Sequence, residues 1–237
     1  MQRRSFLRAG LVSTGVFLAG CLSDSETVLD PPDREHDVDP EALAYPAHSQ
    51  ELPEETLPSP LHDREVSTRA YVGDRETLLT FVFTRCPGPC PALTSTLAQA
   101  QTAAADAGFS EEVVFMPITF DPEYDTPEQV RAFSEDNGAD PTATNWQFLR
   151  PQTKERAREV VDEQFGVAFE TVPVEGSDHG DHGTDENEMD EEEMTFIHSN
   201  LLLLVNRDGY VERAYSPEPP RADVVIDDLE AVREGYQ

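Results

Sequence analysis

Two cysteines, Cys86 and Cys90, are the residues of this chain best suited to chemistry. They follow an apolar run, Leu78 to Phe83, and lie in a Pro/Gly-rich turn that opens a helical segment. The free N–H groups and the positive dipole end of a helix stabilise anions. A cysteine placed there tends towards the thiolate, which binds metals and attacks disulfides, and Arg85 favours the same form. The spacing lets both sulfurs converge on one point. It predicts a redox or metal-binding pair, with an ordinary structural disulfide as the alternative.

A distant histidine, His198, can complete a soft ligand set with the two cysteines. It stands before the leucine-rich run Leu201 to Val205, which predicts a buried strand. Thiolates select Cu(I), zinc or iron–sulfur clusters, and imidazole also accepts Cu(II). A structural zinc site usually has four protein ligands and no open position, whereas three ligands can serve copper in both oxidation states. The spacing alone leaves open whether His198 is a ligand or a structural residue at the start of a strand.

Strands and helices alternate along the chain and would position these residues. Apolar runs predict a hairpin or paired strands within 61–71, and further strands at 77–83, 113–120, 146–149, 167–172, 201–205 and 210–215. Helical patterns cover 92–107, 127–137, 153–165 and 222–233. This order indicates an α/β fold with a mixed central sheet flanked by helices. A cysteine pair between the first long strand and the first helix suggests a thioredoxin-like fold.

Asp121 directly follows the strand expected at 113–120. The carboxyl end of a strand in an open α/β sheet faces the functional crevice, so Asp121 is a candidate site residue. Asp125 and Thr126 have a structural explanation, because Thr126 can cap a helix with Pro127 at its first position and Gln129 completing a capping box.

The N-terminus predicts export and a lipid anchor. Arg3 and Arg4 precede an apolar run that is shorter than the ~20 residues of a membrane-spanning helix. Residues 1–21 therefore resemble a twin-arginine signal with a lipobox, in which Cys21 is lipidated; a spanning helix is the alternative. Both place the domain outside the cytoplasmic membrane, tethered to its extracytoplasmic face.

Composition separates a linker from a folded domain. Residues 22–58 are rich in Asp, Glu and Pro, which predicts a disordered linker, and the domain is expected over 59–237. Within it, 174–193 reads as an acidic loop carrying His179 and His182, either simply solvated or collecting metal weakly. The net charge of −31 argues against a nucleic-acid partner and is typical of halophilic proteins.

Three segments together resemble the Sco/SenC family of copper-binding, thioredoxin-fold proteins. They are Phe-Thr-Arg-Cys-Pro-Gly-Pro-Cys-Pro at 83–91, Thr-Phe-Asp-Pro-Glu-Tyr-Asp-Thr-Pro at 119–127, and Ile197-His198 before the leucine-rich strand and Asp208-Gly209. The resemblance covers 59 to the C-terminus. The chain departs from it at Gly88 and Ile197, where many members have Asp.

The resemblance implies that Cys86, Cys90 and His198 bind one copper ion, with Asp121 beside the ligands. It also implies a role in building the binuclear copper site of cytochrome c oxidase subunit II. Our hypothesis is a metallochaperone that passes copper to the partner's thiolates. The alternative is a thiol-disulfide oxidoreductase that keeps those cysteines reduced, which needs the same thiols and not the histidine. A lipoprotein with a purely structural disulfide is a third reading.

Overall fold

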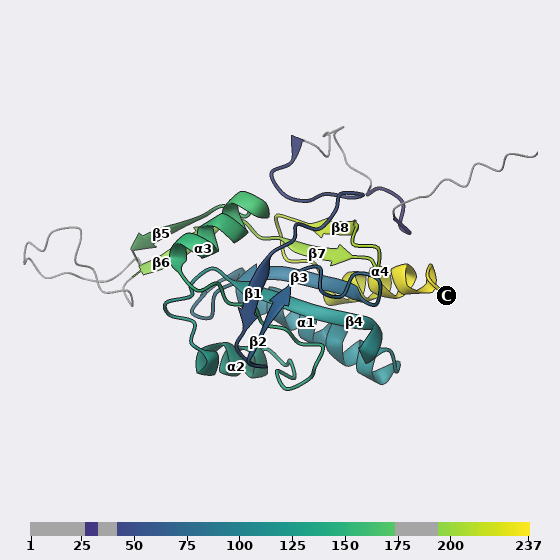
Figure 1. Cartoon of the computed structure of the whole chain (residues 1–237), viewed down its shortest axis with the longest axis horizontal. Helices are drawn as coiled ribbons and strands as arrows, with labels where there is room; N and C mark the ends of the chain where they lie inside the picture. Colours follow the sequence, from purple (N-terminus) through teal and green to yellow (C-terminus); the bar gives the residue numbers. More distant parts are fainter. Residues whose placement is uncertain (1–26, 33–41, 174–193) are drawn as a thin grey trace, which may run out of the picture.

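The structure is a computed structural model that describes residues 27–32, 42–173 and 194–237. Its strands are β1 (Thr56–Ser59), β2 (Arg64–Ser67), β3 (Glu76–Val82), β4 (Val113–Thr119), β5 (Phe169–Pro173), β6 (Met194–His198), β7 (Leu202–Val205) and β8 (Val211–Tyr215) (Figure 1). Its helices are α1 (Pro89–Asp106), α2 (Pro127–Asp136), α3 (Lys154–Ala157) and α4 (Ala222–Glu234), with a 3₁₀ turn at Ser110–Glu112 and a π-helix, Arg158–Gln164, continuing α3.

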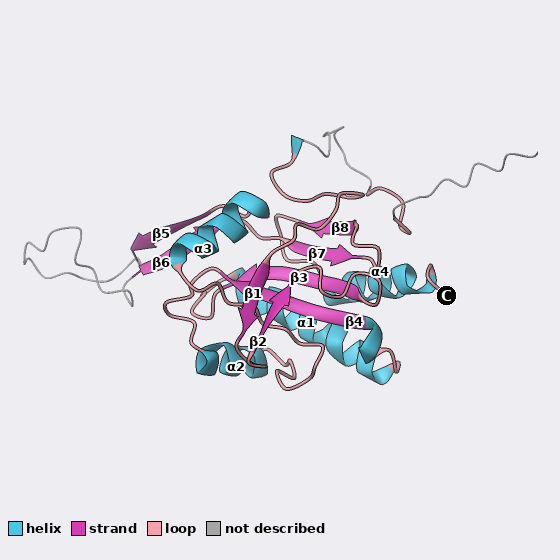
Figure 2. Cartoon of the chain, in the orientation of Figure 1, coloured by secondary structure: helices cyan, strands magenta, loops and turns pink. Residues whose placement is uncertain are grey.

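A four-stranded mixed sheet, in the order β4-β3-β7-β8, forms the centre of the domain. β3 runs parallel to β4 and antiparallel to β7, which pairs antiparallel with β8. α1 packs against β3 and β4 and lies beside α4 (Figure 2). The expected α/β class, with a mixed central sheet flanked by helices, is confirmed.

The two parallel strands are the most deeply buried elements. Every residue of β3 and of β4 is buried, as expected for near-continuous apolar runs covered on both faces. The segment expected as a strand at 146–149 lies alongside β4 and joins it through isolated bridges at Trp146 and Leu149. Both parallel strands end at the same edge, so the loops that follow them lie side by side.

The start of α2 confirms the expected capping box. The Gln129 N–H donates to Thr126 Oγ1 at 3.3 Å, and the Thr126 N–H donates to Gln129 Oε1 at 2.8 Å. This cap fixes where the helix begins after the loop from β4.

The expected boundary at Ser59 is wrong, because the ordered chain begins earlier. β1 crosses that boundary and pairs antiparallel with β2. Leu52 and Leu57 are fully buried in the core, although they lie in a stretch rich in Glu and Pro. Buried apolar residues and backbone hydrogen bonds, such as that from the Leu52 N–H to the carbonyl of Gly209, together dock 42–58 on the domain. The N–H groups of Val28 and Leu29, farther upstream, donate to the two carboxylate oxygens of Glu212.

His198 does not start the leucine-rich strand. It ends β6, which pairs antiparallel with β5 as a separate two-stranded ribbon, and β7 begins only at Leu202. The register of the ribbon places His198 opposite Phe169. The chain must leave the ribbon after His198 before it can enter the central sheet.

Several expected features lie outside the described residues: the signal at 1–21 with Cys21, and the loop 174–193 with His179 and His182. Within the described ranges, no helix combines the length and the apolar character needed to cross a bilayer.

Candidate metal centre

The loop between β3 and α1 carries both cysteines to one place. The Cys86 N–H donates to the carbonyl of Phe83, and the Gly88 N–H donates to Cys86 Sγ at 3.4 Å. Cys90 lies in the first turn of α1, which begins at Pro89. Both cysteines are buried and both are free thiols. The strand-to-helix position expected from the sequence is confirmed.

His198 reaches the thiols from the ribbon. Its Nε2 lies 3.6 Å from Cys90 Sγ, and its Nδ1 lies 3.1 Å from the carbonyl oxygen of Ser199. A carbonyl oxygen only accepts hydrogen bonds, so this contact favours the tautomer with the proton on Nδ1. The lone pair of Nε2 is then directed at the sulfur and is available to a metal.

The donor atoms of Cys86, Cys90 and His198 all lie within 4.8 Å of one another. One ion can span such a set, since the separation is about twice the ~2.3 Å metal–sulfur distance of protein sites. Two sulfurs and one imidazole nitrogen form a soft set that suits Cu(I) or zinc. The structure thus brings together three residues that lie up to 112 positions apart in the sequence.

The pKa values of the two thiols are shifted in opposite directions. The hydrogen bond from Cys90 lowers the pKa of Cys86 well below its ordinary value, aided by the Gly88 N–H. Burial raises the pKa of Cys90 above its ordinary value, and the negative charge favoured at Cys86 adds to this effect. Cys86 is therefore the thiolate of the metal-free pair, and Cys90 holds the proton.

Asp121 supports the cysteine loop through Arg85. The Arg85 Nε lies 2.8 Å from Asp121 Oδ2, and its guanidinium lies over the ring of Tyr124 at 4.6 Å. Asp121 is almost fully buried, and its own N–H donates to Thr119. The positive charge of Arg85, which was expected to favour the thiolate, is therefore paired with the carboxylate of Asp121. Asp121 lies next to the site and orients the residue that precedes Cys86.

Asp125 is a site residue that the sequence reasoning missed. It is fully buried, and it accepts hydrogen bonds from the N–H and hydroxyl of Thr84 and from the hydroxyl of Thr119. Burial raises the pKa of Asp125 to about 6. Thr84 opens the cysteine loop, so Asp125 fixes this loop to the end of β4. In the sequence, Asp125 had been attributed to the start of the helix that Thr126 caps. Thr84, a hydroxyl-bearing residue two positions before Cys86, was the feature that could have indicated a partner for it.

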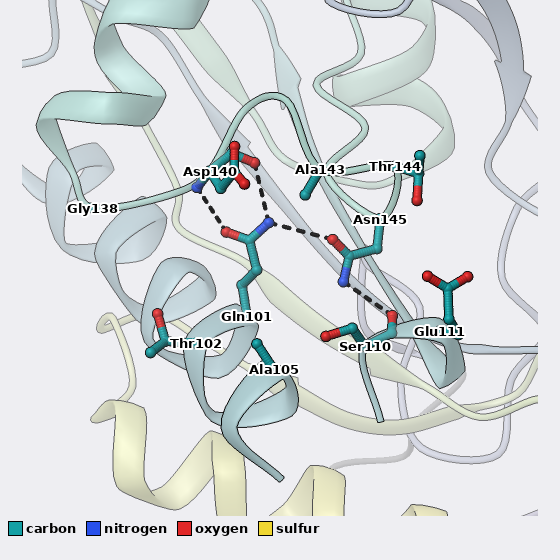
Figure 3. A pocket seen from close by; sticks show the side chains of 10 residues that line it. All are labelled: Gln101, Thr102, Ala105, Ser110, Glu111, Gly138, Asp140, Ala143, Thr144 and Asn145. Atoms are coloured by element: carbon teal, nitrogen blue, oxygen red, sulfur yellow. Dashed lines mark hydrogen bonds between the residues drawn. The ribbon is translucent and has the colours of Figure 1, made fainter. Parts of the chain in front are cut away.

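A cavity of about 460 Å³ lies elsewhere, between the second half of α1 and the loop that follows α2. The Gln101 amide donates to Asn145 and exchanges hydrogen bonds with the backbone of Asp140, while Asn145 donates to the carbonyl of Ser110 (Figure 3). These amides are occupied in joining two loops to α1. The cavity is about 11 helical positions, or roughly 17 Å, from Cys90 and takes no part in the metal centre.

The family model of SCO1/SenC matches residues 61–234. The chain belongs to the SCO1/SenC family. The match spans the thiol pair, the loop of Asp121 and Asp125, and His198. No curated protein matches the chain.

Solved structures of SCO1/SenC proteins share the fold. A SCO1/SenC family lipoprotein from Bacillus anthracis is 20% identical with a TM-score of 0.58, covering 78% of this chain and 96% of its own. Arabidopsis thaliana ScoI with copper bound is 21% identical with a TM-score of 0.56, covering 77% and 98%. BsSco, described with a disulfide switch as a member of the Sco family of cytochrome c oxidase assembly proteins, is 22% identical with a TM-score of 0.55, covering 82% and 98%. The thioredoxin-like fold is confirmed.

Proposed function

We propose that this chain is a copper metallochaperone that assists assembly of the binuclear copper site of cytochrome c oxidase subunit II. The observation that carries the proposal is the convergence of two free thiols and one imidazole nitrogen within 4.8 Å. Family membership supports it, as do the copper bound to the Arabidopsis relative and the oxidase-assembly role given for BsSco.

Copper is the cargo of this site, held by Cys86, Cys90 and His198. Three ligands leave a direction of approach open to a fourth. A thiolate of the partner can therefore bind the ion before a site ligand leaves, so copper passes between proteins without release to water. This ligand exchange transfers no electron. When copper leaves, Cys90 takes up one proton, which balances a proton released by a partner thiol that binds copper as thiolate, and Cys86 remains a thiolate.

Copper titration of the reduced chain tests the proposal. Cys21→Ser leaves only the two site thiols of the three cysteines, and a Cu(I) chelator in high salt sets the free copper. One copper per chain, with affinity weakened in His198→Ala and abolished in Cys86→Ser, is expected. Unchanged affinity in Cys86→Ser would contradict the proposal.

A second candidate is thiol-disulfide oxidoreduction, favoured by the opposite acidities of the two thiols. The Cys86 thiolate would attack a disulfide of the partner, form a mixed disulfide and release one partner thiolate. Cys90, losing its proton, would then attack Cys86 and release the second. The pair gives up two electrons and becomes a disulfide, while the partner's disulfide becomes two thiols.

His198 separates the two candidates, because copper binding needs its nitrogen and thiol exchange does not. Oxidase assembly restored by His198→Ala in cells lacking the wild-type chain, and not by Cys86→Ser, would favour the oxidoreductase. Loss of assembly in both variants, rescued by added copper only where the thiols remain, would favour the metallochaperone.

We also propose that the domain acts on the extracytoplasmic face of the membrane, held by lipid on Cys21. The sequence at 1–21 supports this placement through its arginine pair and lipobox. Replacement Cys21→Ser should abolish incorporation of a labelled fatty acid and release the chain from membranes. Equal membrane retention of that variant would argue for a spanning helix instead.

A further inference from the structure

A cluster of aromatic rings joins the His198 ribbon to the domain. Among the described strands, β5 and β6 pair only with each other, so the central sheet's hydrogen-bond ladder does not hold them. The junction is made by four phenylalanines, here called the ring cluster: Phe83, Phe120, Phe169 and Phe196.

The rings come from both sides of the junction. Phe83 and Phe120 directly follow the carboxyl ends of β3 and β4, and both are buried. On the ribbon, Phe196 and His198 are two residues apart and so share one face of β6. Phe169 pairs with His198 across the ribbon. One face of the ribbon therefore presents two rings and the imidazole to two rings of the domain.

Phe120 is the centre of this contact. Its ring centroid lies 5.2 Å from Phe83, 5.0 Å from Phe169 and 5.4 Å from Phe196. It also lies 5.0 Å from the imidazole of His198, whose other ring neighbour is Phe83 at 5.8 Å, edge-on. Aromatic pairs attract each other beyond their burial at separations of about 4.5–7 Å.

The polar contacts of the imidazole do not replace these rings. Nδ1 bonds the carbonyl of Ser199, the next residue along the chain, so this contact is local. Nε2 lies 3.6 Å from Cys90 Sγ, within hydrogen-bond distance for sulfur, so its polar contact with the domain is with the thiol itself. The rings of Phe83 and Phe120 flank the imidazole and hold it where Nε2 faces the thiols.

We propose that Phe120 is a positioning residue that seats His198 on the thiol pair through the ring cluster. The inference rests on the proposed function, because it concerns the histidine ligand of the same site. With the cluster intact, the ion has three protein ligands. When the ribbon loosens, the imidazole withdraws and two thiolates remain, which opens the position that a partner's thiolate takes.

A double-variant cycle tests this role. Cu(I) affinity is measured by chelator competition on the reduced chain with Cys21→Ser, with and without Phe120→Leu and His198→Ala. We expect Phe120→Leu to weaken binding about tenfold, as changes to groups that support a ligand do, and His198→Ala, which removes the ligand itself, to weaken it by about a hundredfold or more. The double variant should bind no more weakly than His198→Ala alone. Losses that multiply would overturn the proposal, since Phe120 would then act on the thiols.

Phe115→Leu is the matched control. Phe115 is equally buried on β4, but its ring stacks on Trp146 at 6.1 Å. That variant should lose thermal stability to a similar extent and keep its copper affinity; a tenfold loss of affinity would overturn the proposal. Phe196→Leu removes a half-buried ring from the ribbon side and should repeat the effect of Phe120→Leu, which keeps the test open if the latter fails to fold.

A measurement on the metal-free chain separates this inference from the proposed function. Nuclear Overhauser contacts between the His198 imidazole and the Phe120 ring are expected in the wild type and should disappear in Phe196→Leu. If these contacts were present in a chain that binds no copper, the positioning of His198 by the ring cluster would be supported and the metallochaperone function would be contradicted. Tight copper binding without them would overturn the inference alone.

Discussion

Glu76 and Asp125 are buried carboxylates at opposite ends of β3, and they are bonded in different ways. At its amino end, Glu76 is fully buried and paired with Arg207, with Nε to Oε1 at 2.7 Å. Arg207 also bonds Glu112 at 2.8 Å, and Arg233 bonds the same carboxylate at 3.0 Å. At the carboxyl end, the hydrogen bonds that the structure gives Asp125 come from neutral groups of Thr84 and Thr119.

The difference separates a structural charge cluster from a reactive site. At the amino end, cations and carboxylates alternate, so each charge has an opposite charge in contact. At the carboxyl end, two sulfurs and a nitrogen converge on one point, and the neighbouring cation, Arg85, is paired with Asp121. The lone pairs of these three atoms repel one another unless a proton or a metal ion lies between them. The contrast predicts that changes at the two ends affect different measurements.

The largest expected effect belongs to the carboxyl end. Cys90→Ser replaces a soft ligand with a hard, weakly acidic hydroxyl and should lower Cu(I) affinity by about a thousandfold or more, roughly 4 kcal/mol. The midpoint of thermal unfolding should change little, since the side chains are similar in size. Chelator competition and calorimetry on the same samples check both halves. A variant that lost stability but kept copper would break the contrast.

Arg207→Met should have the reverse profile. It leaves Glu76 buried without its cation, and such losses cost about 3–5 kcal/mol in fully buried pairs. Because the Arg207 side chain is 22% exposed, about 2–3 kcal/mol is the better expectation. Urea unfolding measures this loss, and copper affinity should remain that of the wild type. Arg75→Met, at an arginine whose two acceptors are exposed, is the control and should cost well under half as much.

Sequence patterns sufficed for those parts of the molecule in which neighbours along the chain act together. The apolar runs at β3 and β4, the capping box of α2 and the thiol spacing are all local. The ribbon could not be predicted in this way, because its strands are separated by 174–193 and pair through contacts distant in sequence. His198 was therefore attached to the nearer leucine run. Asp125 was missed for the same reason, since its partners Thr84 and Thr119 belong to two different strand ends.

Asp125→Asn should reveal the buried carboxyl through pH. The pKa of Asp125 is raised from its ordinary value to about 6, so the folded state favours the protonated form. Its stabilising contribution is present below about pH 4 and is lost as the pH rises through about 6. The stability of the wild type relative to Asp125→Asn should therefore fall by about 2–3 kcal/mol between pH 4 and pH 7. Denaturant unfolding of both chains at each pH measures the difference.

A pH-independent difference between those two chains would mean that Asp125 stays ionised when buried. Asp125 would then be a buried charge as Glu76 is, and the contrast between these two carboxylates would narrow. Glu212→Gln is a useful control, because Glu212 is also fully buried but its carboxylate accepts N–H groups far from the thiols. Thiol reactivity should change in the Asp125 variant alone.

The smallest effect is expected at Gly88, where a charge can be added beside Cys86. Gly88 is exposed, and a Cβ there would lie 4.0 Å from Cys86 Sγ, an ordinary contact. In Gly88→Asp the carboxylate should raise the pKa of Cys86 by about half a unit and weaken copper binding less than about fivefold, because exposed charges are screened by water. Gly88→Asn, with the same shape and no charge, should match the wild type.

The rate of Cys86 alkylation, measured against pH, gives the shift in the pKa of Cys86. This shift should vanish in molar salt, where the screening length is about 3 Å. A shift that survived such salt would mean that the added side chain acts on the loop's conformation, and the low pKa of Cys86 would then depend on backbone geometry more than on charge.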